Sequence, residues 1–164
     1  MPPPSSRAPV SVLFVCMGNI CRSPIAEGVF LHVLRQRGLE DRCHVDSAGT
    51  GDWHAGERPD HRAIETAERH GIHLPSVARA VTRDDFDRFD HLICMDRLNA
   101  RELLARGAPP KKVRLLLDFD QTIGHDELPD PYYGDVAGFE LVFTLCERAC
   151  TAVADRLFDR TASR

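Results

Sequence analysis

A short segment near the N-terminus combines cysteine, glycine and arginine at a spacing that suits phosphate chemistry. It reads Cys16-Met17-Gly18-Asn19-Ile20-Cys21-Arg22-Ser23. Gly18 and Asn19 can adopt left-handed or other unusual backbone conformations, so that successive N–H groups point inward and form a nest for an anion. A helical pattern follows, and its positive N-terminal end strengthens the attraction. The segment therefore predicts a loop that binds a tetrahedral oxyanion.

Cys16 and Arg22 are the residues of this loop that can do more than bind. We expect the Cys16 thiol to ionise, because helix N-termini and nearby cations stabilise a thiolate, which is the nucleophilic form. The planar guanidinium of Arg22 can hold two phosphate oxygens. The same spacing recurs at Cys150 and Arg156, but that pair falls inside a helical pattern without glycine. We therefore predict that Cys16 attacks phosphorus and that Arg22 binds the phosphate.

The departure of an alkoxide or phenoxide needs a proton donor, and Asp130 is the candidate. A positioned general acid typically contributes about 10²–10⁴ in rate. Pro129 and Pro131 flank Asp130 and hold the backbone extended. Tyr132 and Tyr133, the only tyrosines, follow directly and could form the wall of a pocket for an aromatic substrate. An ordinary Asp-Pro turn with surface tyrosines explains the same residues equally well.

Two other kinds of site are disfavoured. A nucleotide-binding loop needs Gly-Lys-Ser/Thr after its glycine, and this segment lacks it. A zinc site built on Cys16 and Cys21 would need a second pair of ligands. Cys146 and Cys150 are four residues apart on the apolar face of a helical pattern, where packing is the simpler explanation. We expect no metal and no other cofactor.

The elements that position these residues follow from the apolar patterning. Short apolar runs bounded by turn residues predict strands at residues 11–16, 43–47, 89–95 and 113–117. Apolar residues at helical spacing predict helices at residues 23–37, 60–70, 96–106 and 139–157, with Ser23 as the cap of the first. This alternation indicates an α/β domain with a parallel sheet and helices on both faces. Such sheets bind ligands beyond the carboxyl ends of their strands, where Cys16 lies.

Length and composition place further limits. The chain has 164 residues, 43% hydrophobic and 28% charged, as expected for one globular domain. We assign residues 1–10 to a disordered N-terminal tail and residues 11–160 to the domain. No apolar run is long enough to span a membrane, and the net charge of −4 without a basic run disfavours binding to nucleic acid or to a membrane surface. Six cysteines without a secretory signal indicate reduced thiols and a cytoplasmic location.

These motifs together resemble those of the low-molecular-weight protein tyrosine phosphatases. The matching segments keep the family's order and are residues 12–24, Asp46-Ser47-Ala48-Gly49-Thr50, His70-Gly71-Ile72, Ala78-Arg79, Cys94-Met95-Asp96 and Asp130-Pro131-Tyr132-Tyr133-Gly134. They extend from about Ser11 to Phe158. Trp53-His54 is more similar to bacterial members than to animal ones.

The resemblance implies a four-stranded parallel sheet with the oxyanion loop after its first strand, and hydrolysis of phosphotyrosine and small aryl phosphates without a metal. Cys16 would form a cysteinyl-phosphate, Arg22 would stabilise the transition state, and Asp130 would protonate the leaving phenol and then act as base on water. The other residues implied to bind substrate are Met17, Gly18, Asn19, Ile20, Cys21, Ser23, Trp53, Tyr132 and Tyr133.

The same resemblance implies that Asn19 is strained and is held by Ser23 and Ser47. Many relatives also carry a histidine that bonds the loop asparagine, two residues before the Ala-Arg pair. Here that position is Ser76, which is shorter, so the loop relies on Ser76, on water or on another partner.

The implied partners are a phosphotyrosine-containing protein and, in the loop, inorganic phosphate or another oxyanion. A tyrosine kinase could phosphorylate Tyr132 and Tyr133. Oxidation of Cys16 could be captured as a disulfide with Cys21, although Cys21 is equally well explained as a small residue packed in the loop.

Two other functions remain as alternatives. An arsenate reductase on the same fold needs two further cysteines after the third strand to relay a disulfide; Cys94 lies near that place, but no cysteine follows before Cys146. A module that only binds phosphopeptides would explain the loop and Arg22, but it leaves Cys16 and Asp130 without a role.

Overall fold

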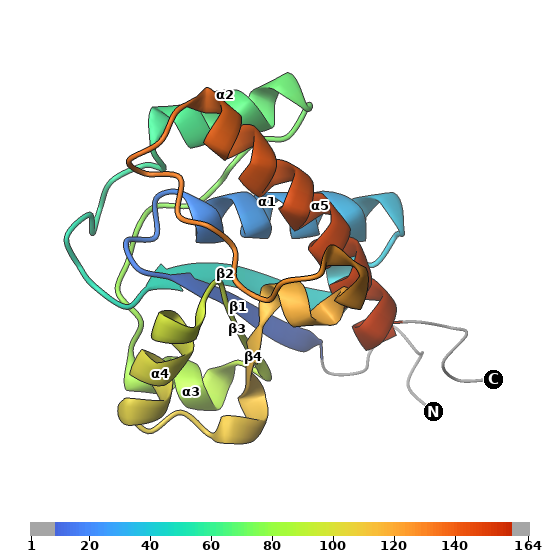
Figure 1. The fold of residues 1–164 in the computed structure, drawn as a ribbon. Helices are drawn as coiled ribbons and strands as arrows, with labels where there is room; N and C mark the ends of the chain where they lie inside the picture. Colours follow the sequence, from blue (N-terminus) through green and yellow to red (C-terminus); the bar gives the residue numbers. More distant parts are fainter. Residues whose placement is uncertain (1–8, 159–164) are drawn as a thin grey trace.

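Four parallel strands in the order β2-β1-β3-β4 form the centre of the computed structural model, which describes residues 9–158 (Figure 1). They are β1 (Val10–Cys16), β2 (Cys43–Gly49), β3 (His91–Cys94) and β4 (Val113–Leu115). The four-stranded parallel sheet expected from the sequence is confirmed. Most of the tail expected at residues 1–10 lies outside the described residues, and Val10 already belongs to β1.

Helices cover both faces of the sheet, as expected (Figure 1). They are α1 (Arg22–Gln36), α2 (His61–Arg69), α3 (Arg83–Arg88), α4 (Arg97–Ala105) and α5 (Val136–Phe158). Short 3₁₀ turns lie between them, namely η2 (Glu40–Arg42), η3 (Pro110–Lys112), η4 (Leu116–Phe119) and η5 (Gln121–Ile123). Helices α1, α2 and α5 lie on one side of the sheet, and α3 and α4 lie on the other.

The apolar run of β1 is buried on both faces because it lies inside a parallel sheet. Val12 and Phe14 pack into the core beneath α1 and α5, whereas Leu13 and Val15 pack into the core on the side of α3 and α4. The chain passes from β1 outward to β2 and then crosses to β3 on the other side of β1. This reversal opens a crevice at the carboxyl ends of β1 and β3, the usual ligand site of such sheets.

The start of the first helix differs from the expectation. Helix α1 begins at Arg22, and Cys21 occupies the N-cap position without a side-chain cap. Ser23 is therefore a residue of the first turn and does not cap the helix. Its hydroxyl instead lies 3.0 Å from Cys16 Sγ, inside the loop.

Helix α3 was not predicted from the apolar pattern because it is only six residues long. A local signal does exist, since Thr82 and Asp85 form a reciprocal capping box at its start. The third and fourth strands are also shorter than predicted. Phe89 closes α3 before β3 begins at His91, and the chain turns into η4 directly after β4 ends at Leu115.

A cluster of charges ties α3 to the sheet. Both guanidinium nitrogens Nη1 and Nη2 of Arg79 donate to the buried carboxylate of Asp85, at 2.9 and 3.0 Å, and Nη2 also bonds Asp46 of β2 at 3.0 Å. The backbone on either side of Arg79 joins the end of β2, since Gly49 N donates to Arg79 O and Val81 N donates to Gly49 O. Arg79 thus fixes the segment that lies beside the loop.

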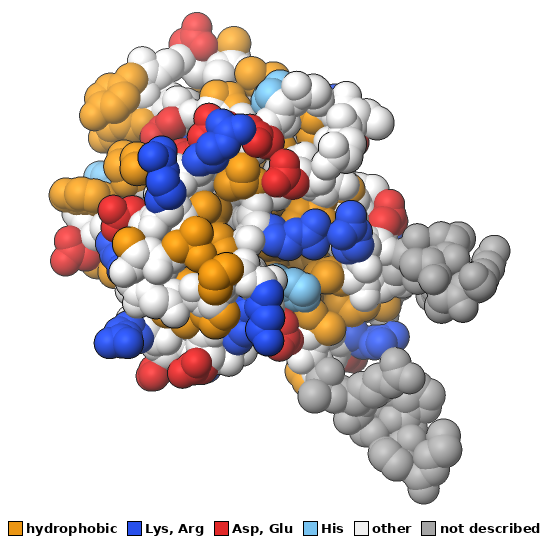
Figure 2. Space-filling model, turned by 60° about the horizontal axis from the view of Figure 1, so that its bottom comes forward, with side chains coloured by type: hydrophobic (Ala, Val, Ile, Leu, Met, Phe, Trp, Pro, Cys, Tyr) orange, Lys and Arg blue, Asp and Glu red, His pale blue; other side chains and the backbone are white. Residues whose placement is uncertain are grey.

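On the face that carries α3 and α4, Figure 2 shows acidic and basic side chains interspersed, with apolar atoms between them. Within residues 9–158, no helix is long and apolar enough to cross a membrane.

We predict that Asp85→Asn lowers the free energy of unfolding by about 2 kcal/mol, because the Arg79 guanidinium loses a charged acceptor and the capping box is weakened. Urea unfolding monitored by circular dichroism measures this change. Asp87→Asn, at an exposed position of the same helix, is the matched control. If both variants unfolded at the same urea concentration as the wild type, the cluster would have no stabilising role.

Candidate functional site

The segment that joins β1 to α1 curls around the Cys16 thiol. Asn19 has φ 57°, and within residues 9–158 it is the only non-glycine residue with positive φ. Asn19 N donates to Cys16 Sγ at 3.3 Å. The sulfur therefore accepts a main-chain hydrogen bond near the N-terminus of α1, which is the arrangement expected for a loop that stabilises an anion.

The Asn19 side chain holds this conformation through three hydrogen bonds to different parts of the fold. Its amide nitrogen donates to Ser23 Oγ of α1 at 2.8 Å and to Ser47 Oγ of β2 at 3.0 Å. Its amide oxygen accepts from Arg79 N at 3.0 Å. The contacts to Ser23 and Ser47 agree with the placement that the resemblance implies.

The support expected from Ser76 is not formed. This serine is buried, and among the described residues no partner lies within hydrogen-bond distance of its hydroxyl oxygen. Of the possibilities that the sequence left open, the structure shows another partner, since Arg79 N donates to the Asn19 amide oxygen. Arg58 holds the segment through the carbonyls of Leu74 and Ser76.

Glu27 extends this network into the protein interior and was not identified from the sequence. Ser47 Oγ donates to Glu27 Oε1 at 2.6 Å, which leaves the Ser47 oxygen free to accept from Asn19. Burial raises the pKa of Glu27 from 4.5 to about 7, and the nearby Asp46 carboxylate adds to this, against the Ser47 hydrogen bond and the Arg79 charge. The only sequence signal was a charged residue within an otherwise apolar helical stretch.

Backbone bonds fix the rest of the loop to its neighbours. Thr50 N donates to Cys16 O, Gly51 N donates to Met17 O, and Asp60 N donates to Ile20 O, at 2.8–3.0 Å. Gly49 allows this close approach, because a Cβ there would lie 2.7 Å from Met17 O. The Gly-rich stretch after β2 therefore supports the loop.

Arg22 is buried beneath the loop opening and is held by two acceptors. Its Nη1 donates to Asp96 Oδ2 at 2.8 Å and to Leu128 O at 3.0 Å. Asp96 is itself fixed as the N-cap of α4 by a capping box with Asn99. Burial lowers the pKa of Arg22, but the Cys16 sulfur and the Asp96 carboxylate outweigh this and raise it. Arg22 Nη2 lies 3.7 Å from Asp130 Oδ2.

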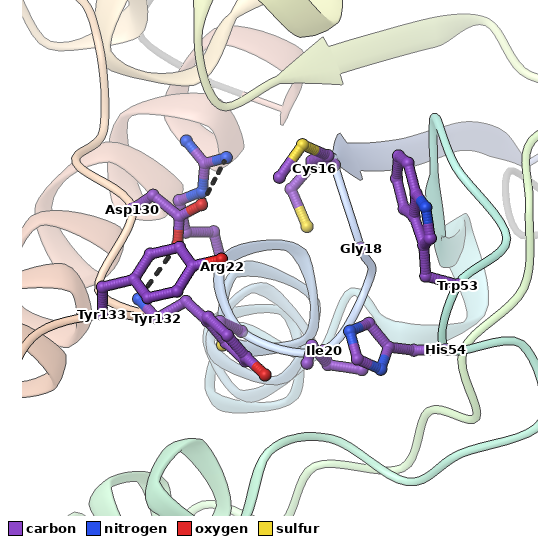
Figure 3. A pocket seen from close by; sticks show the side chains of 11 residues that line it. Cys16, Gly18, Ile20, Arg22, Trp53, His54, Asp130, Tyr132 and Tyr133 are labelled. Atoms are coloured by element: carbon purple, nitrogen blue, oxygen red, sulfur yellow. Dashed lines mark hydrogen bonds and ion pairs between the residues drawn. The ribbon is translucent and has the colours of Figure 1, made fainter.

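A pocket of about 320 Å³ opens above the loop. It is lined by Cys16, Met17, Gly18, Ile20, Cys21, Arg22, Trp53, His54, Asp130, Tyr132 and Tyr133. Figure 3 shows Trp53 and His54 on one side, with Asp130 and the two tyrosines on the other. The catalytic candidates are thus brought together. His54, which was not named as a site residue, lies against Gly18.

The walls of the pocket are exposed whereas its floor is not. Cys16 is 3% exposed, Trp53 67% and Tyr133 94%. The rings of Tyr132 and Tyr133 meet edge to face with centroids 4.9 Å apart. Asp130 Oδ1 accepts from Tyr132 N at 3.1 Å, which turns the carboxyl group toward the pocket.

The six cysteines are all free and buried. Burial raises the pKa of the five others, Cys21, Cys43, Cys94, Cys146 and Cys150. Cys94, the last residue of β3, is fully buried, whereas a cysteine that relays a disulfide in arsenate reduction must be accessible. Among the described residues, no group of three His, Cys, Asp or Glu side chains is placed to hold a metal ion.

Comparison with known proteins gives a match over most of the chain. The model of the family described as low molecular weight phosphotyrosine protein phosphatase matches residues 11–162. A Mycobacterium bovis protein named low molecular weight protein-tyrosine phosphatase A is 43% identical over 156 residues, which cover 94% of this chain and 95% of the relative.

Solved structures give the same match. A protein tyrosine phosphatase from Entamoeba histolytica, with Hepes in its active site, superposes with a TM-score of 0.87 at 40% identity and covers 90% of this chain and 96% of its own. A structure described as a Drosophila arginine phosphatase superposes with a TM-score of 0.84 at 30% identity, with 91% and 98% covered.

We predict that Glu27 makes the free energy of unfolding depend on pH. Its pKa is raised in the folded chain, so its contribution to stability is complete below pH 4.5 and is lost as the pH rises through 7. Glutamine does not titrate, so Glu27→Gln lacks this loss of stability. The free energy of unfolding of Glu27→Gln minus that of the wild type should therefore increase by about 2–3 kcal/mol from pH 5 to pH 8. Urea unfolding at both values measures the gain. Glu65→Gln, at an exposed position of α2, should show no such trend, and a parallel pH dependence of wild type and Glu27→Gln would contradict the assignment.

Proposed function

The chain belongs to the low molecular weight phosphotyrosine protein phosphatase family, and we propose that it hydrolyses phosphotyrosine in proteins, and small aryl phosphates, through a cysteinyl-phosphate. The observation that carries this proposal is the meeting of Cys16, Arg22 and Asp130 in one pocket at the carboxyl end of β1. The three groups match the needs of the reaction, which are a nucleophile, an oxyanion ligand and a proton donor.

In the first step, Cys16 Sγ attacks the phosphorus atom on the side opposite the aryl oxygen. The S–P bond forms as the P–O bond to the aryl group breaks, and the electron pair of that bond goes to the phenol oxygen. Asp130 gives this oxygen its proton, so a neutral phenol leaves. The loop N–H groups and Arg22 stabilise the three equatorial oxygens, because these donors are already oriented before the reaction.

In the second step, Asp130 acts in reverse. Its carboxylate takes a proton from a water molecule, whose oxygen attacks phosphorus. The S–P bond breaks, Cys16 leaves as a thiolate, and inorganic phosphate is released. One carboxyl group therefore serves as acid and then as base.

The shape of the pocket favours aryl phosphates. A substrate must reach a nearly buried sulfur between walls formed by Trp53 and the two tyrosines. An aryl phosphate spans this depth and packs against aromatic rings, which contribute about 0.5–1.5 kcal/mol beyond buried area. The phosphate of a serine side chain is too close to its own backbone to reach as far.

We also propose a modifying enzyme and a cellular location for this protein. A tyrosine kinase would find Tyr133 accessible, because it is almost fully exposed. Six free cysteines favour a reducing compartment, which supports a cytoplasmic location.

Hydrolysis of two aryl phosphates tests the mechanism. We expect Cys16→Ser to be inactive but still able to bind phosphate, as measured by calorimetry, because the loop donors remain. Asp130→Asn should lower kcat/KM for phenyl phosphate about 10²-fold or more. It should have much less effect on 4-nitrophenyl phosphate, since nitrophenolate needs little protonation to leave. Equal activity of the three proteins would contradict the mechanism.

The choice between phosphotyrosine and phosphoarginine tests the substrate class, since one structural relative is described as an arginine phosphatase. We expect kcat/KM to favour phosphotyrosine by about tenfold or more, because the aromatic walls contact its ring. Trp53→Ala should reduce this preference. A preference for phosphoarginine in the wild type would reassign the substrate.

A further inference from the structure

Among the described residues, one arginine of α2 supplies the side-chain hydrogen bonds from the rest of the fold to the backbone of residues 129–134, the segment that carries Asp130. Arg62 Nη2 donates to Tyr132 O at 3.0 Å, and Nη1 donates to Gly134 O at 3.3 Å. The guanidinium also lies over the Tyr132 ring, 5.6 Å from its centroid. A single side chain thus contacts two carbonyls and one ring of the segment.

Other attachments of this segment are few. Before it, Leu128 is fixed by bonds from Leu128 N to Met95 O and from Arg22 to Leu128 O. Within it, and among the described residues, the only main-chain bond runs from Gly134 N to Pro131 O. The Asp130 carboxyl is 38% exposed; its Oδ2 lies 3.7 Å from Arg22 Nη2, and its bond to Tyr132 N stays inside the segment. Because Arg22 contacts the carboxyl group and not the backbone of the segment, the backbone position of Asp130 depends on what holds the residues that follow it.

Arg62 can hold this backbone because its own guanidinium is fixed by Asp60, a residue that is hydrogen-bonded to the loop of residues 16–22. Its Nε and Nη2 form a fork with the Asp60 carboxylate, at 3.0 and 2.9 Å, and Asp60 N donates to Ile20 O of the loop. Hydrogen bonds from Arg62 hold the pKa of Asp60 below its ordinary value. On the other side, the guanidinium rests 4.7 Å from the centroid of the Phe139 ring in α5.

We propose that Arg62 is a positioning residue for Asp130: with Asp60, it connects the loop that holds the phosphate to the segment that holds the proton donor. This inference rests on the proposed role of Asp130 as general acid. The physical basis is that proton transfer needs the donor within hydrogen-bond reach of the leaving oxygen, and a displacement of about 1 Å can cost as much as 10²-fold in rate. An arginine suits the role because its planar fork reaches the carboxylate and the two carbonyls at the same time.

The test compares kcat/KM for phenyl phosphate and 4-nitrophenyl phosphate in Arg62→Ala and in a control, Arg69→Ala. Arg69 lies on the same helix, and its side chain bonds Glu140 of α5 and Thr66 of its own helix and not the segment of residues 129–134. We expect Arg62→Ala to lose about tenfold with phenyl phosphate and less than about threefold with 4-nitrophenyl phosphate. Arg69→Ala should lose little with either substrate. Arg62→Lys, which keeps the charge but not the fork, should fall between Arg62→Ala and wild type.

A double variant separates positioning from a general loss of structure. If Arg62 acts through Asp130, then adding Arg62→Ala to Asp130→Asn should lower kcat/KM for phenyl phosphate by less than about twofold. Circular dichroism checks that each variant is folded, and only folded variants are compared. Should Arg62→Ala misfold, Arg62→Lys carries the same comparison.

Each outcome bears on a different claim. Equal losses with both substrates in Arg62→Ala, or a full further loss in the double variant, would overturn the positioning role while the proposed function stands. If Asp130→Asn itself showed no dependence on the leaving group, the proposed acid would be wrong, and the role of Arg62 would fall with it.

Discussion

The left-handed conformation of Asn19 is the constraint on which the site depends. A loop can aim several N–H groups at one point only if its backbone leaves the ordinary regions, and a non-glycine residue pays about 1–2 kcal/mol for that. Ser23, Ser47 and Arg79 N hold the Asn19 amide and so keep the residue in place. Asparagine serves here because its side chain can be held on both its nitrogen and its oxygen.

The network around Asn19 explains why distant parts of the chain belong to one site. Ser47 lies in β2. Arg79 lies in the segment that is hydrogen-bonded to the end of β2, and the carboxylates of Asp46 and Asp85 hold its guanidinium. Arg22 is fixed by Asp96 at the start of α4. The reversal of strand order beside β1 brings these groups to one end of the sheet, so that the fold itself assembles the binding loop and its acid.

Local patterns predicted the sheet, the main helices and the loop, because these rest on apolar periodicity and on residues that allow unusual backbone conformations. The resemblance drawn from the motifs is confirmed by the match over residues 11–162. An error arose where a local rule competed with a distant contact. Ser23 looked like a helix cap, but its hydroxyl is used beside Cys16. For the support of Asn19 the sequence left Ser76, water or another partner open, and the fold supplies Arg79 N as another partner.

The sequence alone determined the chemistry available at the loop, since Cys16, Gly18, Asn19 and Arg22 are neighbours along the chain. Only the tertiary structure decided which distant residues join them. The charged Glu27 interrupts an apolar stretch of α1, but this does not show which groups it contacts, and nothing in the local pattern distinguishes Arg62 from other arginines on α2. Their partners are brought near by the packing of α1 and α2. Proximity of that kind depends on the whole fold, and a pattern confined to neighbouring residues does not contain it.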